Sequence, residues 1–188
     1  MKPECQHHGK FAIPEALRLD HEELRTVLVC AMAEPGPIGK TATRLAQLCL
    51  PHFEQEEKIV FPVFGLLNEL ASGDIRPEMA DLLPLVYAFH AGRLGKEHQS
   101  IDAAIKALLH AARAEDCAQI VEFANKLQVH EQVEEAVIYP AVVLIGKYLR
   151  HRLGRRSGRR WPESAGTWRS RYATRRVGGE YRGASGNA

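Results

Sequence analysis

The sequence is poor in cysteine, and its few cysteines form no recognisable motif. Only four occur in 188 residues, widely spaced and without a C-x-x-C pair. A zinc ribbon and a thioredoxin-like redox pair both need such a pair, so both are excluded. Scattered thiols are typical of a reducing compartment, and a cytoplasmic location is expected. The four are Cys5, Cys30, Cys49 and Cys117.

Long apolar runs are also missing. The longest, AVIYPAVVLIG at residues 136–146, falls far short of the about 20 residues that span a bilayer. The first residues, MKPECQHHGKFAIPEALRLD, contain no apolar run of the kind found in signal peptides. We therefore expect no membrane span.

No segment alternates between apolar and polar residues as a strand would, and the pattern is instead helical. Ala, Leu, Glu, Lys and Gln dominate four segments separated by short connectors rich in Pro or Gly, such as EPGPIG and SGDIRP. Short connections predict an all-α, up-down-up-down four-helix bundle over residues 14–149, after an N-terminal segment at 1–13. The predicted helices cover residues 14–34, 39–71, 77–112 and 116–149.

Proline occurs inside three of these predicted helices. A proline lacks the backbone N–H and crowds the preceding turn, so each should kink its helix or divide it into pieces. The residues concerned are Pro51, Pro62, Pro84 and Pro140.

Charge is unevenly distributed, although the whole chain has a net charge of only +2. Residues 147–188 carry eleven Arg and one Lys against two Glu, a net charge of +10, which leaves −8 for residues 1–146. The Arg/Gly-rich segment 150–188 has no periodic apolar face, so it is predicted to be a disordered basic tail. Its Arg pairs and aromatic residues could bind nucleic acid or anionic lipid, and a terminus without a specific partner is the simpler interpretation.

One motif occurs twice, 78 residues apart. HFEQEEKIVFP at 52–62 and HEQVEEAVIYP at 130–140 share a histidine, two glutamates, an aromatic residue and a proline at equal spacing. Residues i and i+4 lie on one face of a helix. His52 with Glu56, and His130 with Glu134, can therefore each direct an imidazole and a carboxylate to one point. A single pair of this kind is commonly a solvated ion pair.

Two further histidines match this repeat. In an antiparallel helix hairpin, residues equidistant from the turn lie at the same height. The midpoints of His21 with His52, His52 with His98, and His98 with His130 fall at 36.5, 75 and 114, each in a predicted connection. One layer of the bundle is thus expected to contain His21, His52, Glu56, His98, His130 and Glu134.

A buried layer of six ionisable side chains would be costly without a cation. Imidazole and carboxylate ligands without thiolate suit iron, manganese or zinc, and six ligands exceed the needs of one tetrahedral zinc. Two octahedral ions with bridging carboxylates fit better. Ferritin-like di-iron bundles use Glu-x-x-His, a pattern that none of the four histidines in this layer shows.

At these residues the sequence resembles the hemerythrin-like family, in the branch called HHE cation-binding domains. The resemblance covers roughly residues 14–149 and is carried by LRLDHEELR, HFEQEEKIVFP, LGKEHQSI and HEQVEEAVIYP. It implies a four-helix bundle with a non-haem di-iron centre, that is, two iron ions. Founding members bind oxygen reversibly, and relatives sense oxygen or iron, handle nitric oxide or peroxide, or take part in repair of iron–sulfur centres.

The chain departs from the oxygen carriers of that family at two points. They have H-x-x-x-H on the third helix, where Leu94 stands four residues before His98. They have H-x-x-x-x-D on the fourth helix, where this chain has H-x-x-x-E. One imidazole is missing, and His90 is expected to lie outside the ligand set. The loss of this nitrogen ligand would leave an additional open site on the metal. Such a site favours redox reactivity or nitric oxide binding over simple oxygen carriage.

These observations lead to a specific hypothesis. Glu56 and Glu134 would bridge two irons. His21 and His52 are placed on one side and His98 and His130 on the other, with the assignment of histidines to each iron left open. Apolar neighbours would form a dry pocket for a diatomic ligand, oxygen or nitric oxide. They are Leu24, Ile59, Ile101 and Val137.

Other acidic residues near the motifs are expected outside the ligand set. Glu57 and Glu135 are turned about 100° from the ligand carboxylates and should pair with Lys or Arg. Asp102 should be a neighbour of the site. The alternative to a metal centre is a metal-free bundle with a hydrogen-bonded polar layer. A binding or sensing protein is favoured over a dedicated enzyme, and the oligomeric state is left open.

Overall fold

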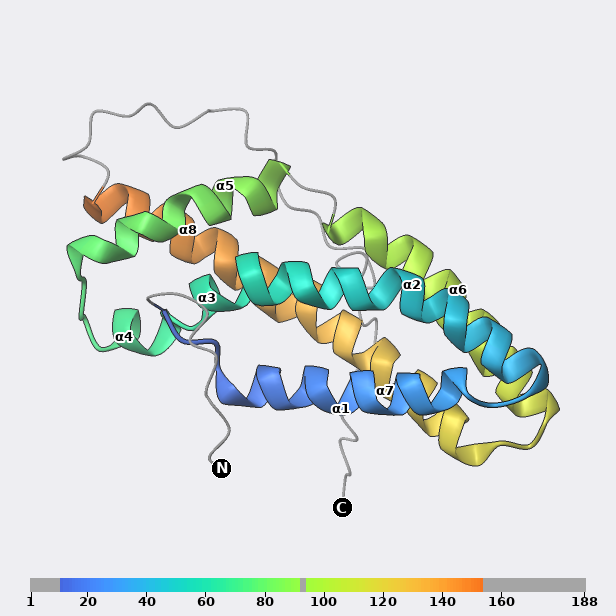
Figure 1. The fold of residues 1–188 in the computed structure, drawn as a ribbon. Coiled ribbons are helices and arrows are strands. Elements are labelled where there is room, and N and C mark those ends of the chain that lie inside the picture. The colour runs from blue at the N-terminus through green and yellow to red at the C-terminus, as the bar shows by residue number, and fades with distance from the viewer. Residues whose placement is uncertain (1–10, 92–93, 154–188) are drawn as a thin grey trace, which may run out of the picture.

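The structure, a computed structural model, describes residues 11–91 and 94–153, and every regular element within them is a helix. The predicted all-α class is therefore confirmed. Figure 1 shows the elements in order. They are α1 (Glu15–Met32), α2 (Gly36–Ile59), α3 (Phe61–Phe64), α4 (Leu67–Ala71), the 3-10 helix η1 (Pro77–Leu82), α5 (Leu83–Ala91), α6 (Leu94–Ala114), α7 (Ala118–Val133), the π-helical turn η2 (Glu134–Ile138) and α8 (Tyr139–Leu153).

The first connection is the tight turn that its composition predicts. Gly36 has a φ of +73°, in the left-handed region that glycine enters without a steric penalty. Pro37 follows in the first turn of α2, where its missing N–H has no partner to lose. The turn therefore reverses the chain within a few residues and places α2 beside α1.

The second predicted helix is divided by one of its two prolines. Pro51 is accommodated inside α2, which ends at Ile59. Pro62 then stands in the first turn of α3, a separate helix. Because a proline at this place cannot donate to the preceding turn, the helix breaks around Val60.

The third predicted helix is also divided. Pro77 begins the 3-10 helix η1, and Pro84 lies in the first turn of α5 rather than at a bend. The long third helix is α6, which begins only at Leu94. The chain thus makes an excursion through α3, α4, η1 and α5 between α2 and α6.

The fourth predicted helix is continuous but contains a wide turn. The π-helical turn η2 joins α7 to α8, and Pro140 is the second residue of α8. A wider turn relieves the clash between a proline ring and the carbonyl of the preceding turn. The helix extends to Leu153, four residues beyond the predicted end.

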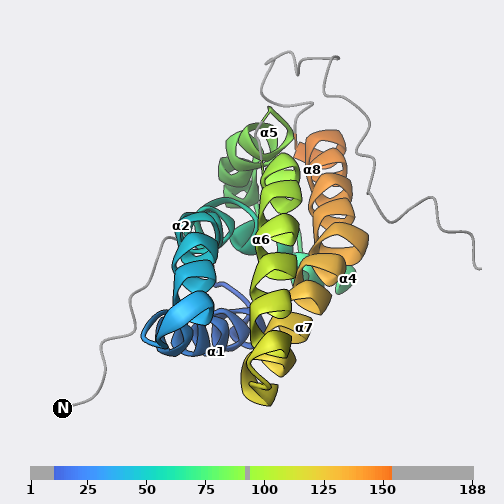
Figure 2. The same ribbon diagram turned by 90° about the vertical axis from the view of Figure 1, so that its right-hand side faces the viewer.

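The four long segments pack in a closed order. α1 packs against α2, α2 against α6, α6 against α7, and α7 against α1. Figures 1 and 2 show that α8 continues the line of α7, with α5 beside α8. Gly146 permits that approach, because a Cβ there would lie 2.4 Å from Cγ1 of Val86.

The interior contains two separate apolar clusters. The first lies among α1, α2, α6 and α7, and includes Phe53, Ile101 and Leu127. The second lies among α3, α5 and α8 and includes Phe61 and Ile138. Buried polar residues lie between the two clusters, namely Glu56 on α2, His98 on α6, and His130 and Glu134 along the α7–α8 helix, so a polar layer separates the cores.

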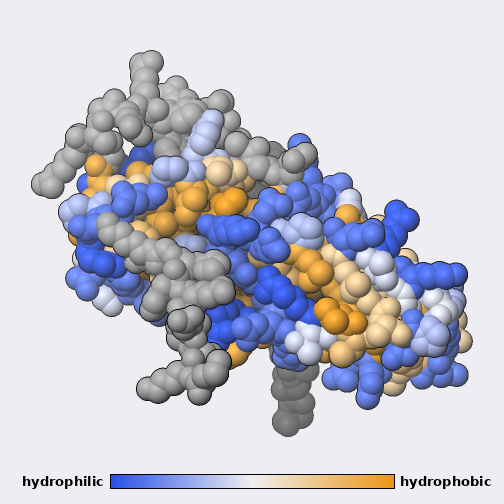
Figure 3. Space-filling model, viewed as in Figure 1, coloured by the Kyte–Doolittle hydropathy of each residue, from blue (hydrophilic) through white to orange (hydrophobic). Residues whose placement is uncertain are grey.

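The visible surface is mixed in character. Figure 3 shows hydrophilic and hydrophobic residues intermixed on one face of the molecule. Within the described ranges, no helix combines the length and apolar character needed to cross a bilayer. The predicted disordered tail began at residue 150, but residues 150–153 belong to α8, so that part of the prediction was wrong. The rest of the tail, 154–188, and its predicted contact with nucleic acid lie outside the described residues, as does most of the segment 1–13.

Candidate metal centre

The four histidines of the predicted layer come from four different helices. His21 lies on α1, His52 on α2, His98 on α6 and His130 on α7, and all four are buried. Glu56 joins them from α2, and Glu134 from η2, both almost completely buried. The structure therefore brings together all six side chains that the sequence predicts as ligands.

The six residues form two overlapping groups. Half-site A contains His21, His130 and the two glutamates, and half-site B contains His52, His98 and the same two glutamates. In each group the ligand atoms lie within 4.8 Å of one another, and each group can hold a metal ion. Glu56 and Glu134 belong to both, which is the arrangement required of bridging ligands.

This grouping differs from the hypothesised pairing of the histidines. The sequence led us to place His21 with His52 and His98 with His130, because each pair belongs to one hairpin. In the structure His21 instead shares a half-site with His130, and His52 with His98. The reason is that α1 also contacts α7, and α2 contacts α6, so the half-sites form across the hairpins.

Half-site A is spaced like a coordination shell. Nε2 of His21 lies 3.5 Å from Oε2 of Glu56 and 3.8 Å from Oε1 of Glu134. Nε2 of His130 lies 2.9 Å from Oε1 of Glu134. Ligands about 2.1 Å from one ion and at right angles to each other are about 3 Å apart, so these separations suit a shared cation.

Half-site B has similar spacing. Nε2 of His52 and Nε2 of His98 are 2.8 Å apart. Oε2 of Glu56 lies 3.6 Å from His52 Nε2, and Oε2 of Glu134 lies 3.5 Å from His98 Nε2. Two imidazole nitrogens this close to each other and to carboxylate oxygens are typical of ligands that converge on one ion.

The two glutamates reach both half-sites in different ways. Glu134 divides its oxygens, since Oε1 faces His21 and His130 while Oε2 faces His98. Glu56 uses one oxygen, Oε2, toward both His21 and His52. Its other oxygen accepts a hydrogen bond from Tyr139. Glu134 is therefore suited to bridge through two oxygens, and Glu56 through one.

Most of the inward-facing atoms lack hydrogen-bond partners, apart from Nε2 of His52 and Nε2 of His98, which contact each other. Nε2 of His21 and of His130, Oε2 of Glu56 and both oxygens of Glu134 are buried and form no hydrogen bond. The contact between His130 and Glu134 has the distance of an ion pair but not the orientation of a hydrogen bond. Buried polar atoms are normally satisfied. A bound cation would satisfy the lone pairs of the nitrogen and carboxylate oxygen atoms together. These ligand atoms therefore fit a metal ion.

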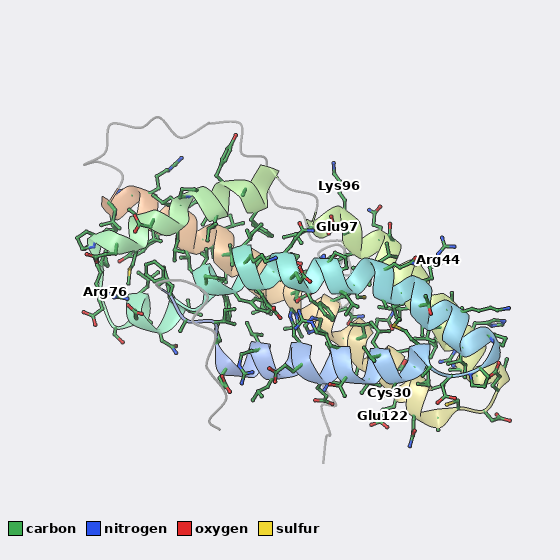
Figure 4. All side chains as sticks on the ribbon, in the orientation of Figure 1. Cys30, Arg44, Arg76, Lys96, Glu97 and Glu122 are labelled. Atoms are coloured by element: carbon green, nitrogen blue, oxygen red, sulfur yellow. The ribbon has the colours of Figure 1, made fainter. Side chains whose placement is uncertain are left out.

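Each histidine is oriented by a carboxylate at its outer nitrogen. Nδ1 of His21 bonds to Glu57, that of His52 to Glu97, that of His98 to Glu135 and that of His130 to Asp20, at 2.7 to 3.2 Å. A proton on Nδ1 leaves the lone pair of Nε2 directed inward. Figure 4 labels Glu97 near the start of α6.

These contacts confirm one expectation for the neighbouring acids and add partners that were not expected. Glu57 pairs with Arg25, as expected, and also with His21, and Glu135 pairs with His98. Asp102 bonds to Lys106 at 2.7 Å, as expected of a residue outside the ligand set. For Glu57 and Glu135, the signal in the sequence was their position as the second glutamate of each HxxxEE motif.

The carboxylates dominate the electrostatics of the layer. Burial alone would lower the pKa of His21, but Glu134, Glu56 and Glu57 outweigh it and raise the pKa to about 9. The same balance raises the pKa of His130 to about 10. The pKa of Glu134 is held well below its usual value, against the effect of burial, by the nearby histidines. Protons on the imidazoles and a bound cation are thus alternative ways to neutralise this layer.

Tyr139 is a member of the site that the sequence did not identify. It is fully buried, and its hydroxyl donates to Oε1 of Glu56 at 2.5 Å while lying 3.1 Å from Nε2 of His98. Burial, and then the charge of Glu56, raise the pKa of Tyr139 well above its usual value, which keeps it a donor. The available signal was its position in the repeat, where it matches Phe61.

Apolar residues surround the layer. Of the four predicted to do so, three are buried or half-buried and one is exposed. Leu24 and Ile101 are buried as expected, and Ile59 is half-buried. Val137 is 55% exposed, so its assignment to the pocket was wrong. The wide turn η2 directs it to solvent. The rings of Phe53 and Phe61 lie 4.2 and 4.8 Å from the ring of His21.

The buried His/Glu cluster can therefore hold a metal ion. The side chain of His90, expected outside the ligand set, is not among those the structure describes. No family model, curated protein or solved structure matches the chain.

Proposed function

We propose that this chain is a hemerythrin-like four-helix protein that binds two non-haem iron ions and a diatomic ligand, oxygen or nitric oxide. His21 and His130 would bind one ion, and His52 and His98 the other. Glu56 and Glu134 would bridge them. The role is in sensing, scavenging or iron handling.

One observation carries this proposal: Nε2 of His21 and of His130, Oε2 of Glu56 and both oxygens of Glu134 are buried together without a hydrogen bond. A metal-free polar layer would be expected to satisfy such atoms with one another. Here the four outer Nδ1 atoms bond to carboxylates, whereas the inner atoms of half-site A have no partner. In half-site B, Nε2 of His52 and Nε2 of His98 contact each other at 2.8 Å.

The ligand types favour iron. The set consists of imidazole and carboxylate, and Cys49, the nearest buried thiol on α2, is not a member of either half-site. Burial and the charge of Glu131 raise the pKa of Cys49, so it stays a thiol. Nitrogen and oxygen ligands with two bridging carboxylates suit a pair of iron ions and their redox chemistry.

Each half-site leaves room for a small exogenous ligand. Four protein residues serve each half-site, two of them shared, whereas an octahedral ion takes six ligands. The buried side chains of Leu24 and Ile101 limit access of bulk water. Tyr139 supplies a hydroxyl next to half-site B, where it can donate its one proton to an oxygen of a bound molecule in place of Glu56.

The test is the metal content of the purified chain and of matched variants. The wild-type protein, prepared from iron-replete cells without an affinity metal column, should contain about two irons per chain by mass spectrometry. Glu56→Ala and Glu134→Ala should each lose iron, because both half-sites lose a ligand. Glu54→Ala, on the same helix but exposed and paired with Lys58, is the control and should retain iron.

Ligand binding is tested next on the iron-loaded protein. Addition of nitric oxide or oxygen to the reduced protein should change the visible spectrum, and the Glu134→Ala variant should not show the change. Wild-type protein without metal after anaerobic loading with ferrous iron would exclude the proposal and favour the metal-free polar layer. Iron binding without any response to either gas would exclude the diatomic ligand.

A further inference from the structure

The long α7–α8 helix exposes a continuous apolar face that is independent of the metal centre. From residue 129 to residue 148, ten residues are not buried, and only Gln132 and Lys147 among them are polar. We call the other eight the α7–α8 face. They are Val129, Val133, Ala136, Val137, Pro140, Ala141, Leu144 and Tyr148.

This exposure is large for apolar side chains. Val129 is 57% exposed, Val137 55% and Leu144 64%. Twenty helical residues extend over about 30 Å, and a helix is about 10 Å wide, so the face covers on the order of 300 Å². Contiguous apolar patches of this size commonly mark interaction sites. Figure 2 shows α7 and α8 end to end along one edge of the molecule.

The wide turn η2 keeps the face on one side of the helix. In a regular α-helix, Tyr148 would be rotated by about 100° relative to Val129. The π-helical turn at Glu134–Ile138 has more residues per turn and takes up part of that rotation. The same turn directs Glu134 inward and Val137 outward, so the apolar face is a consequence of how the helix is built.

The face has a symmetric pattern about its centre, between Ile138 and Tyr139. Equidistant from that point are Val137 with Pro140, Ala136 with Ala141, Val133 with Leu144, and Val129 with Tyr148. Each apolar residue therefore has an apolar counterpart. In an antiparallel pair of identical helices, equidistant residues lie opposite each other. The small residues stand at the centre, where two crossing helices approach most closely, and larger ones at the ends.

The charges at the two ends favour the same arrangement. At the Val129 end, Lys126 is bonded to Glu23 at 2.6 Å and lies 3.4 Å from Asp20, which also bonds to His130, so the charges there are paired. At the Tyr148 end, the last turn of α8 carries Arg150 and Arg152. An antiparallel pair keeps the basic ends of the two copies apart, whereas a parallel pair sets them together, where like charges repel.

We propose that the α7–α8 face is the contact between two copies of this chain in an antiparallel, twofold-symmetric dimer. A contact of this kind is self-complementary and closes on itself. The face buries less than the about 800 Å² per partner of a standard interface, so the dimer should dissociate on dilution. The proposal does not rest on metal binding.

Sedimentation equilibrium of the full chain tests the proposal. From micromolar to near-millimolar concentration, the mass should rise from the monomer value of 21.0 kDa towards twice that value. Leu144→Glu should keep the monomer mass throughout, and its helical content and unfolding should be unchanged because Leu144 packs on nothing in the core. Val29→Glu, equally exposed but on α1, should still form dimers.

Disulfide trapping tests the antiparallel register. In a background with Cys5, Cys30 and Cys117 replaced by serine, the double variant Val133→Cys with Leu144→Cys should form covalent dimers on oxidation. Either single variant should not, because its two copies would lie well apart along the helices. A wild-type chain that stays monomeric, or a dimer that Leu144→Glu leaves intact, would overturn the proposal. Efficient crosslinking of both single variants would overturn the antiparallel register.

Discussion

The hydroxyl of Tyr139 and Oε1 of Glu56 are 2.5 Å apart, although 83 residues separate them in the sequence. This bond fixes the one oxygen of Glu56 that does not face the histidines. Glu56 can therefore present only Oε2 to the two half-sites. A carboxylate held in this way is preorganised for a bridging position.

Replacement of Tyr139 by Phe should weaken metal binding without abolishing it. The ligands remain, but Glu56 loses the donor that orients it, and loss of such a contact typically weakens metal affinity about 10- to 100-fold. Titration of the loaded protein with a chelator of known affinity measures the change. Tyr87→Phe, an exposed tyrosine on α5, is the control and should behave as the wild type. Equal affinity in Tyr139→Phe and wild type would contradict the positioning role.

Replacement of Glu135 by Ala should also weaken metal binding, because His98 loses the partner of its Nδ1. We expect a loss of about 10- to 100-fold in affinity. Glu97→Ala removes the partner of His52 at a place where the side chain is 33% exposed, so water can replace the carboxylate and the loss should be smaller. Competition with a chelator shows which variant loses more metal affinity. A larger loss in Glu97→Ala would show that the burial of the carboxylate does not determine how much it contributes to metal affinity.

The stability of the metal-free protein should fall at alkaline pH. The pKa values of His21 and His130 are raised to about 9 and about 10, above the ordinary 6.5 of an unfolded chain. Protonation therefore favours the folded state. The contribution is complete below pH 6.5 and is lost as pH rises through these two values, at a cost on the order of a few kcal/mol.

Urea unfolding at pH 6.5 and at pH 10, with and without metal, measures this effect. A bound cation replaces the protons, so the metal-loaded protein should lose much less stability over the same interval. Equal pH dependence of the two forms would show that the imidazoles are not where the metal binds.

Replacement of Gly146 by Ala should destabilise the fold, contrary to the usual effect of this change inside a helix. Ala normally stabilises a helix relative to Gly by up to about 1 kcal/mol. Here the new Cβ would meet Cγ1 of Val86 at 2.4 Å, and overpacking of this kind costs about 1–3 kcal/mol. Thermal unfolding measures the loss. The additional change Val86→Ala should restore part of it, and no coupling between the two sites would exclude the clash.

The sequence predicted the helical class and the six residues of the layer, because both follow from periodic patterns. His and Glu spacing reports which residues share a helix face. Equidistance from the turns reports which of those faces meet. The midpoint of His52 and His98 remained informative even though the chain between α2 and α6 folds into α3, α4, η1 and α5.

The details that could not be predicted depend on tertiary packing. Which histidines share a half-site depends on contacts between α1 and α7 and between α2 and α6, which no local pattern encodes. The role of Tyr139 depends on the wide turn η2, since a regular helix would direct residues 134–139 differently. Val137 was assigned to the interior, but it lies in the same wide turn and is exposed.

The separation of the two apolar clusters by a polar layer has a consequence for how the molecule unfolds. Each cluster has its own buried side chains, and the layer between them contains inner nitrogen and oxygen atoms without hydrogen-bond partners. A cation bound by α1, α2, α6 and α7 together would join the clusters into one cooperative unit. Hydrogen exchange on the metal-free protein should then show two groups of amides that open independently, and metal should merge them. The layer would thus determine whether the protein melts in one step or two.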